Sequence, residues 1–209
     1  MPKGKFIVFE GGEGSGKTSH IKFTARSLEK AGFSVLLTRE PGGSPVCQRI
    51  REIILDKEPK LTSEFAELFL FFADRAQHVA EVILPALQQG KIVLCDRFSG
   101  STFAYQLGGR ALPDADFVKK MEQYSRQSLD PDLVVYLDVE VAVGLSRRQV
   151  DGGVDRIDAE KKQFHERVRN YFLQLTAENN NWLKVSTNAG ALEENSLKVY
   201  QAVKKFLAL

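Results

Sequence analysis

Short apolar runs alternate along the chain with longer stretches whose apolar residues recur at helical spacing. The runs with the length and composition of buried strands are 6–10, 34–38, 92–95, 133–137 and 182–185. Helices are predicted from near Lys17 to Gly32 and at about 44–55, 62–89, 113–128, 141–150, 159–179 and 192–207. Thr62 is expected to cap the third helix and Pro85 to bend or split it. The stretch 99–109 is expected to be a loop or a short helix.

The predicted strands lack polar alternation, which is typical of strands covered on both faces. Together with the intervening helices, this pattern predicts an α/β fold with a parallel sheet. Ligands of such sheets gather where the strands end. The informative polar residues follow three strands, at Glu10 to Thr18, Arg39 to Gly43 and Asp96 to Arg97. We therefore expect one site within a single domain, residues 1–209, with no linker that divides it.

The segment between the first strand and the first helix reads G-x-x-x-x-G-K-T, the phosphate-binding loop pattern. Its residues, the candidates for ATP binding, are Gly11, Gly12, Glu13, Gly14, Ser15, Gly16, Lys17 and Thr18. Glycines let backbone N–H groups curl around an anion, and the following helix adds its positive end. Lys17 can then reach the β- and γ-phosphates, and the Thr18 hydroxyl can reach Mg²⁺. The alternative is a glycine-rich turn without a ligand.

The composition is ordinary for a soluble globular protein, with 43% hydrophobic and 27% charged residues among 209. The net charge of +2 is too small to indicate a nucleic-acid or membrane partner, and we expect neither. Cys47 and Cys95 fit no metal site or disulfide framework, which favours a reducing cytoplasm. The apolar run after Lys3 and Lys5 is too short for a signal peptide, and no run approaches the roughly 18 apolar residues of a membrane span.

Asp96 and Arg97 end the third strand, where a carboxylate can hold Mg²⁺ and an arginine can bind phosphate. The alternative is a capping aspartate and a surface arginine. Arg39, Arg51 and Arg75 are further candidates for a second anion, or are solvated charges. Among the aromatic residues of the third helix, most are expected in the core, and one could stack on a base; these residues are Phe69, Phe71 and Phe72.

A glycine turn, Gly152-Gly153, is flanked by arginines in a manner that suits a lid closing over phosphates. The lid segment is predicted at about 147–158, with Arg147, Arg148 and Arg156 as candidates for neutralising the transferred phosphoryl group. The alternative is an exposed, charged helix end. The three histidines, His20, His78 and His165, are scattered, and we expect them at the surface or in packing, with no triad or metal pattern.

Taken together, these residues resemble the bacterial-type thymidylate kinases, which belong to the nucleoside monophosphate kinases. The T-R-E-P-G-G run at 38–43 and the A-Y-Q run at 104–106 are far more specific than the phosphate-binding loop. The other matching stretches are 9–18, 71–75, 96–98, 101–102, 131–133, 136–138 and 155–156. Two positions depart from relatives: loop position 14 is glycine where eukaryotic-type enzymes carry arginine, and the lid has fewer arginines than in many bacterial relatives.

The resemblance implies a role for each matching position. Lys17 and Thr18 would serve ATP and Mg²⁺, and Glu13 would meet the 3′-hydroxyl of the acceptor. Arg97 and Arg51 would hold the acceptor phosphate. Thymine would contact Phe71 by stacking and Arg75 by hydrogen bonding. The remaining predicted substrate contacts are Arg39, Pro41, Thr102, Tyr105 and Gln106, and the predicted metal ligands are Thr18 and Asp96.

We therefore expect transfer of the ATP γ-phosphoryl group to dTMP, which yields dTDP and ADP for dTTP supply. The predicted catalytic residues are Lys17, Asp96, Arg97, Arg147, Arg148 and Arg156. The resemblance also implies a P-loop NTPase-type fold with five parallel strands, and a homodimer that pairs through helices. The rival interpretations are another nucleotide or nucleoside kinase, a GTP-dependent switch and a degenerate, structural kinase. A switch would need an N-K-x-D type segment, which the sequence lacks.

Overall fold

The computed structural model describes residues 4–56, 58, 61–150, 156–157 and 159–209. Its strands are β1 (Lys5–Glu10), β2 (Val35–Arg39), β3 (Ile92–Asp96), β4 (Leu133–Asp138) and β5 (Trp182–Ser186). Its α-helices are α1 (Lys17–Lys30), α2 (Pro45–Leu55), α3 (Glu64–His78), α4 (Leu84–Gln88), α5 (Ser99–Thr102), α6 (Ala115–Ser125), α7 (Val141–Val150), α8 (Lys162–Glu178) and α9 (Leu192–Phe206). Every strand predicted from an apolar run is therefore confirmed.

Within the described residues the strands form one five-stranded parallel sheet in the order β2-β3-β1-β4-β5. Phe9 pairs with Asp96, and Asp96 pairs with Arg39, so the ends of β1, β3 and β2 lie at one edge. The loops that follow these three strands consequently meet, as the sequence predicts.

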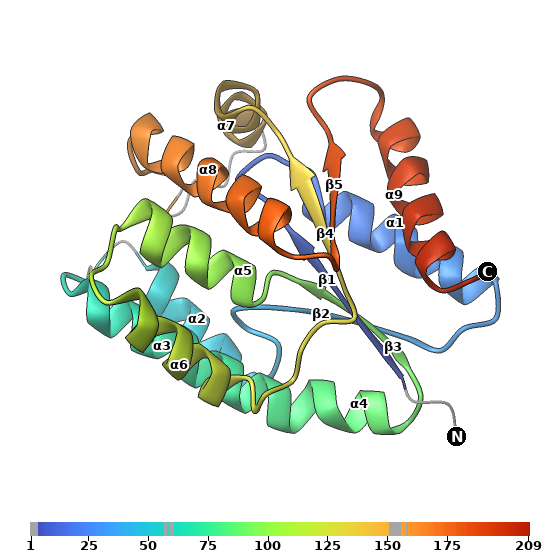
Figure 1. Ribbon diagram of the computed structural model, residues 1–209, viewed down its shortest axis with the longest axis horizontal. Helices are drawn as coiled ribbons and strands as arrows, with labels where there is room; N and C mark the ends of the chain where they lie inside the picture. Colours follow the sequence, from blue (N-terminus) through green and yellow to red (C-terminus); the bar gives the residue numbers. More distant parts are fainter. Residues whose placement is uncertain (1–3, 57, 59–60, 151–155, 158) are drawn as a thin grey trace.

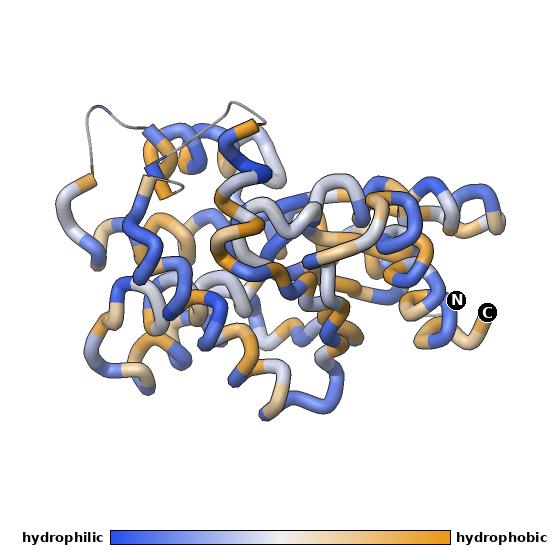
Figure 2. The backbone as a smooth tube through the Cα atoms, turned by 90° about the horizontal axis from the view of Figure 1, so that it is seen from above, coloured by the Kyte–Doolittle hydropathy of each residue, from blue (hydrophilic) through white to orange (hydrophobic). Residues whose placement is uncertain are grey.

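Helices cover both faces of the sheet (Figure 1). Ile21 and Leu28 of α1 and Val199 of α9 pack with β1, β3 and β4 on one face. On the other face, the segment from Val79 to Leu87 packs against Phe6, Val8 and Val93. Figure 2 shows hydrophilic and hydrophobic residues interleaved along the helices, which leaves one side of each for the core. The predicted fold class is confirmed.

The long helix expected at 62–89 is interrupted by a π-helical segment, η1 (Val79–Ile83), in which Leu84 N–H donates to the carbonyl of Val79. Pro85 follows in the first turn of α4. Proline has no N–H for the carbonyl four residues earlier, so the regular hydrogen-bond pattern cannot continue through it. The cap of α3 is Ser63, whose hydroxyl accepts from Ala66 N–H, and not Thr62 as expected.

The stretch 99–109 is helical throughout: α5 continues into a second π-helical segment, η2 (Phe103–Gly109). Tyr105 and Gln106 of this segment line a cavity at the end of the sheet. None of the helices in the described ranges combines the length and apolarity that a membrane span requires.

Candidate active site

A cavity of about 310 Å³ opens where β1, β2 and β3 end. Most of the residues predicted for the site line it: Glu13, Gly14, Ser15, Gly16, Lys17, Thr18, Arg39, Pro41, Arg51, Phe71, Arg75, Asp96, Arg97, Thr102, Tyr105, Gln106 and Arg148. Gly11, Gly12, Arg147 and Arg156 are absent from this lining. The sequence therefore predicts the location of the cavity and most of its wall.

The phosphate-binding loop connects β1 to α1 in left-handed backbone conformations. Gly14 has φ of 65° and Gly16 has φ of 81°, values that favour glycine. Lys17 Nζ donates to the carbonyl oxygens of Gly11 and Gly12, each at 2.9 Å. Burial, followed by the charge of Arg97, lowers the pKa of Lys17 to about 8. The loop thus holds one buried cation beside the start of a helix, an arrangement suited to phosphate.

Gly14 lies against α7. A Cβ added at this position would lie 1.9 Å from the carbonyl oxygen of Gly144, and a Cβ at Gly144 would lie 2.3 Å from the carbonyl oxygen of Glu13. The loop and the helix therefore pack backbone to backbone. This contact gives a physical reason for glycine at position 14.

The two predicted metal ligands lie together, since Thr18 Oγ1 donates to Asp96 Oδ2 at 3.3 Å. Over the part of the chain described, no group of three or more histidine, cysteine, aspartate or glutamate side chains could hold a metal. One hydroxyl and one carboxylate are hard oxygen donors. They fit Mg²⁺, an ion that keeps several waters and takes its other ligands from substrate phosphates.

Arg97 and Glu13 form an ion pair of 2.9 Å at the centre of the cavity. Glu13 Oε1 also accepts from the Tyr105 hydroxyl at 2.6 Å. Burial alone would raise the pKa of Glu13, but the charges of Arg97 and Lys17 outweigh it and lower the pKa to about 2. Arg97 has φ of 70° and donates to the Gly11 carbonyl at 3.1 Å. The ionised pair thus joins the loop after β3 to the phosphate-binding loop.

Glu10 holds the loop after β3 through hydrogen bonds, a role that no sequence motif indicated. The side chain is fully buried and accepts from Phe98 N–H, Ser101 N–H and the Ser101 hydroxyl, at 3.0, 3.0 and 2.6 Å. Burial raises the pKa of this carboxyl group above its usual value. The available signal was a glutamate at the end of an apolar strand.

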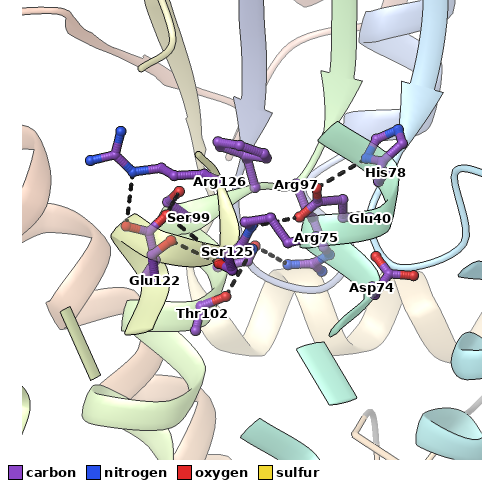
Figure 3. A network of polar contacts seen from close by, with 12 residues as sticks. Glu40, Asp74, Arg75, His78, Arg97, Ser99, Thr102, Glu122, Ser125 and Arg126 are labelled. Carbon is purple, nitrogen blue, oxygen red and sulfur yellow. Dashed lines mark hydrogen bonds and ion pairs between the residues drawn. The ribbon is translucent and has the colours of Figure 1, made fainter. Parts of the chain in front are cut away.

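Arg75 is the largest of the fully buried side chains, with 2% of its area exposed. Its Nε donates to Glu40 Oε2 and its Nη2 donates to Thr102 Oγ1, both at 2.9 Å, within the network of Figure 3. Arg75 is therefore no solvated helix charge, the alternative left open by its spacing. Near it, Phe71 lines the same cavity.

The three phenylalanines of α3 have three different environments. Phe72 is buried in the core beside Leu68, whereas Phe69 is 47% exposed. The expectation that most of them lie in the core is wrong, because only Phe72 does. Phe71, half-buried at the cavity, is the one placed to contact a ligand.

The remaining predicted substrate contacts lie along the same wall. Arg51 Nη1 donates to the Pro41 carbonyl at 2.9 Å, and Arg39 Nη2 donates to Gln48 Oε1 at 3.2 Å. Gln106 is buried and donates to Glu67 Oε1 at 2.6 Å. Two of these contacts involve Gln48 and Glu67, which no sequence motif indicated.

The predicted lid arginines are dispersed. Arg148 lines the cavity, whereas Arg147 donates to the carbonyl oxygens of Thr187 and Asn188, at 3.0 and 3.2 Å. Arg156 is buried, donates to the Ile54 carbonyl at 3.1 Å and forms an ion pair with Glu67. The glycine turn expected between them, with residues 151–155, lies outside the described residues.

All three histidines are buried, so of the two expected environments, surface or packing, they take the second. His20 Nδ1 lies 2.8 Å from the Ser196 hydroxyl, and burial lowers the pKa of His20. His78 contacts Glu40 and Thr38 beside Arg75. Isolated histidines carry no sequence signal for such contacts, because the partners lie up to 176 residues away.

Comparison with known proteins agrees with this geometry. A family model described as thymidylate kinase matches residues 9–198. The chain is 44% identical over 211 residues to the thymidylate kinase of Pelobacter propionicus, a match that covers 98% of this chain and 96% of the relative. It is 47% identical over 171 residues to the thymidylate kinase of Pseudomonas fluorescens, covering 82% and 81%.

Proposed function

The chain belongs to the thymidylate kinase family, and from this premise we propose that it transfers the γ-phosphoryl group of ATP to dTMP, yielding dTDP and ADP. The main support for this proposal is that a single cavity is lined both by a phosphate-binding loop and by residues suited to a base. A phosphate-binding loop with Lys17 forms one side, and an aromatic and guanidinium pair, Phe71 and Arg75, lines the same space. Such a cavity can bring a triphosphate and a nucleoside monophosphate together.

The donor ATP would bind on the loop that precedes α1. Lys17 would give up its contacts with the loop carbonyls for phosphate oxygens, and the helix end would add partial positive charge. Thr18 and Asp96 would hold Mg²⁺, which when bound neutralises charge on the phosphates. The adjacency of their oxygen atoms supports this assignment.

The acceptor dTMP would lie along the opposite wall. Arg97 and Arg51 would bind its phosphate, and Glu13 would face its 3′-hydroxyl. Phe71 would stack on thymine, while Arg75 would donate to a base oxygen. Arg75 lines the cavity beside Phe71, which supports a role as donor.

Transfer requires no covalent enzyme intermediate. An oxygen of the acceptor phosphate would attack the γ-phosphorus in line, and the enzyme would act by positioning and charge neutralisation. We propose residues 147–158 as the lid and Arg148 as its charge at the transferred group, because Arg148 lines the cavity. Arg147 and Arg156 are absent from the lining of the cavity and contact Thr187 and Glu67.

We also propose that the whole chain forms one kinase domain and acts in the cytoplasm as a homodimer. Large apolar side chains are exposed on α2 and α3, where Val46, Ile53, Phe65 and Phe69 each have 44–51% of their area accessible. Exposed apolar side chains on two helices that contact each other support a paired interface, since monomers rarely expose extended apolar patches.

The proposal is tested by following dTDP formation from dTMP and Mg²⁺-ATP by the parent and by Lys17→Ala. Loss of a charge that acts on the transferring phosphate should remove most of the activity, while circular dichroism stays that of the parent. Turnover close to that of the parent in a folded variant would contradict the role of the loop.

A further inference from the structure

His78 lies beside the candidate base pocket without lining it. Its ring is fully buried, and Nδ1 lies 3.0 Å from Glu40 Oε1 (Figure 3). Nε2 lies 2.7 Å from Thr38 Oγ1. An ionised carboxylate can only accept, so the proton between His78 and Glu40 belongs to Nδ1. Nε2 then faces the Thr38 hydroxyl. Both ring nitrogens are occupied, which fixes the orientation of the imidazole.

Glu40 uses its second oxygen for Arg75. Glu40 Oε2 accepts from Arg75 Nε at 2.9 Å, and Arg75 Nη2 donates to Thr102 at 2.9 Å. The remaining nitrogen, Nη1, forms an ion pair with Glu122 Oε1 at 3.8 Å, a separation longer than a hydrogen bond. The direction of the guanidinium plane therefore depends on Glu40 at one edge, and Glu40 depends in turn on His78.

The contact between His78 and the loop after β2 is close. A Cβ added at Gly43 would lie 2.2 Å from His78 Nε2, so the ring packs directly on the loop backbone. This loop carries both Glu40 and Pro41, which line the cavity. The imidazole of α3 thus contacts both the end of β2 and the loop whose residues line the cavity.

We propose that His78 is a positioning residue for the acceptor: it fixes Glu40, and through Glu40 it holds Arg75 in the orientation that binds the base. This inference rests on the proposed function, in which Arg75 contacts the base of dTMP. The simpler alternative is that His78 only stabilises the fold. A structural role would affect both substrates alike, whereas a positioning role affects the acceptor.

Two amide substitutions separate the contacts of the two ring nitrogens. In His78→Asn the new amide nitrogen falls near the position of Nδ1 and keeps a donor for Glu40. In His78→Gln the longer side chain brings its amide near the position of Nε2 and Thr38, which leaves Glu40 without its donor. We expect His78→Gln to raise KM for dTMP about tenfold, the effect of one hydrogen bond to a charged group, with KM for ATP unchanged. For His78→Asn we expect KM for dTMP close to that of the parent.

A double-mutant cycle with Arg75→Ala completes the test. If His78 acts through Arg75, His78→Gln has no further effect on KM for dTMP once Arg75 is absent. Effects that multiply in the double variant would overturn the inference, as would equal increases in KM for dTMP and ATP. If the parent phosphorylates dTMP and His78→Gln has the same KM for dTMP as the parent, only this inference fails. A parent that does not phosphorylate dTMP overturns the proposed function as well.

Discussion

The backbone contact between the phosphate-binding loop and α7 makes Gly14→Ala a demanding substitution. The added Cβ would start 1.9 Å from the Gly144 carbonyl oxygen, whereas ordinary contacts begin at 3.4 Å, so loop and helix must separate by about 1.5 Å. The new residue would also have to keep φ of 65°. Left-handed backbone and overpacking together cost about 2–5 kcal/mol of unfolding free energy.

Gly12→Ala is a matched control within the same loop. A Cβ at Gly12 would meet nothing within 4 Å, and Gly12 is not among the glycines with positive φ. Chemical denaturation of the ligand-free variants should show a loss of stability for Gly14→Ala and a change within about 1 kcal/mol for Gly12→Ala.

The same displacement should reduce catalysis by Gly14→Ala. Misplacement of reacting groups by about 1 Å can cost on the order of 10²-fold in rate. We expect a fall in kcat of that size, measured by coupled release of ADP with saturating dTMP and ATP. If Gly14→Ala unfolds with the same free energy as Gly12→Ala and retains the kcat of the parent, the loop does not depend on this packing and the reasoning is wrong.

Three further predictions follow from the charges and the surface. Because the pKa of Lys17 is about 8 and bound phosphates favour the ammonium form, ATP affinity should fall up to about tenfold per pH unit above pH 8. Calorimetric titrations should show no such fall for Lys17→Arg. An equal pH dependence of ATP affinity in the parent and in Lys17→Arg would contradict the role of Lys17. The pKa of Glu13 is about 2, below its usual value of 4.5, so it contributes up to about 3 kcal/mol of stability that is lost as the pH falls from 4.5 toward 2. The unfolding free energy of Glu13→Gln, measured in urea, should lack that part of the acid dependence. The same pH dependence in Glu13→Gln and in the parent would contradict this contribution of Glu13. Phe69→Glu should convert the proposed homodimer to monomer in sedimentation experiments, unlike Leu197→Glu on α9; a monomeric parent would refute the proposed interface.

The elements of the fold could be predicted because their signals are local. Uninterrupted apolar runs marked all five strands, and the glycine-lysine motif marked the loop between β1 and α1. Positions after strand ends then predicted the cavity, since parallel strands bring those ends together. The π-helical segments η1 and η2 were not predicted, because a single inserted residue leaves no pattern in apolar spacing.

The supporting contacts of the site could not be predicted, because they join residues far apart in sequence. His78 and Glu40 are 38 positions apart, and Arg156 and Glu67 are 89 apart. Nothing in the spacing of Arg156 distinguishes a cation free to reach a phosphate from one buried against a glutamate. Whether a side chain is buried depends on the packing of the whole chain, so the buried position of Arg156 becomes known only from the structure.

The central claim concerns the acceptor, and it is tested most directly by comparing kcat/KM for dTMP with the values for dUMP, dCMP, dAMP and dGMP, with Mg²⁺-ATP as donor. The proposed function predicts that dTMP has the highest value. A wall with Phe71 for stacking and Arg75 as a donor to a base oxygen also predicts a low value for dAMP, whose base has no carbonyl oxygen. A higher kcat/KM for any other monophosphate, or no turnover of dTMP, would contradict the account.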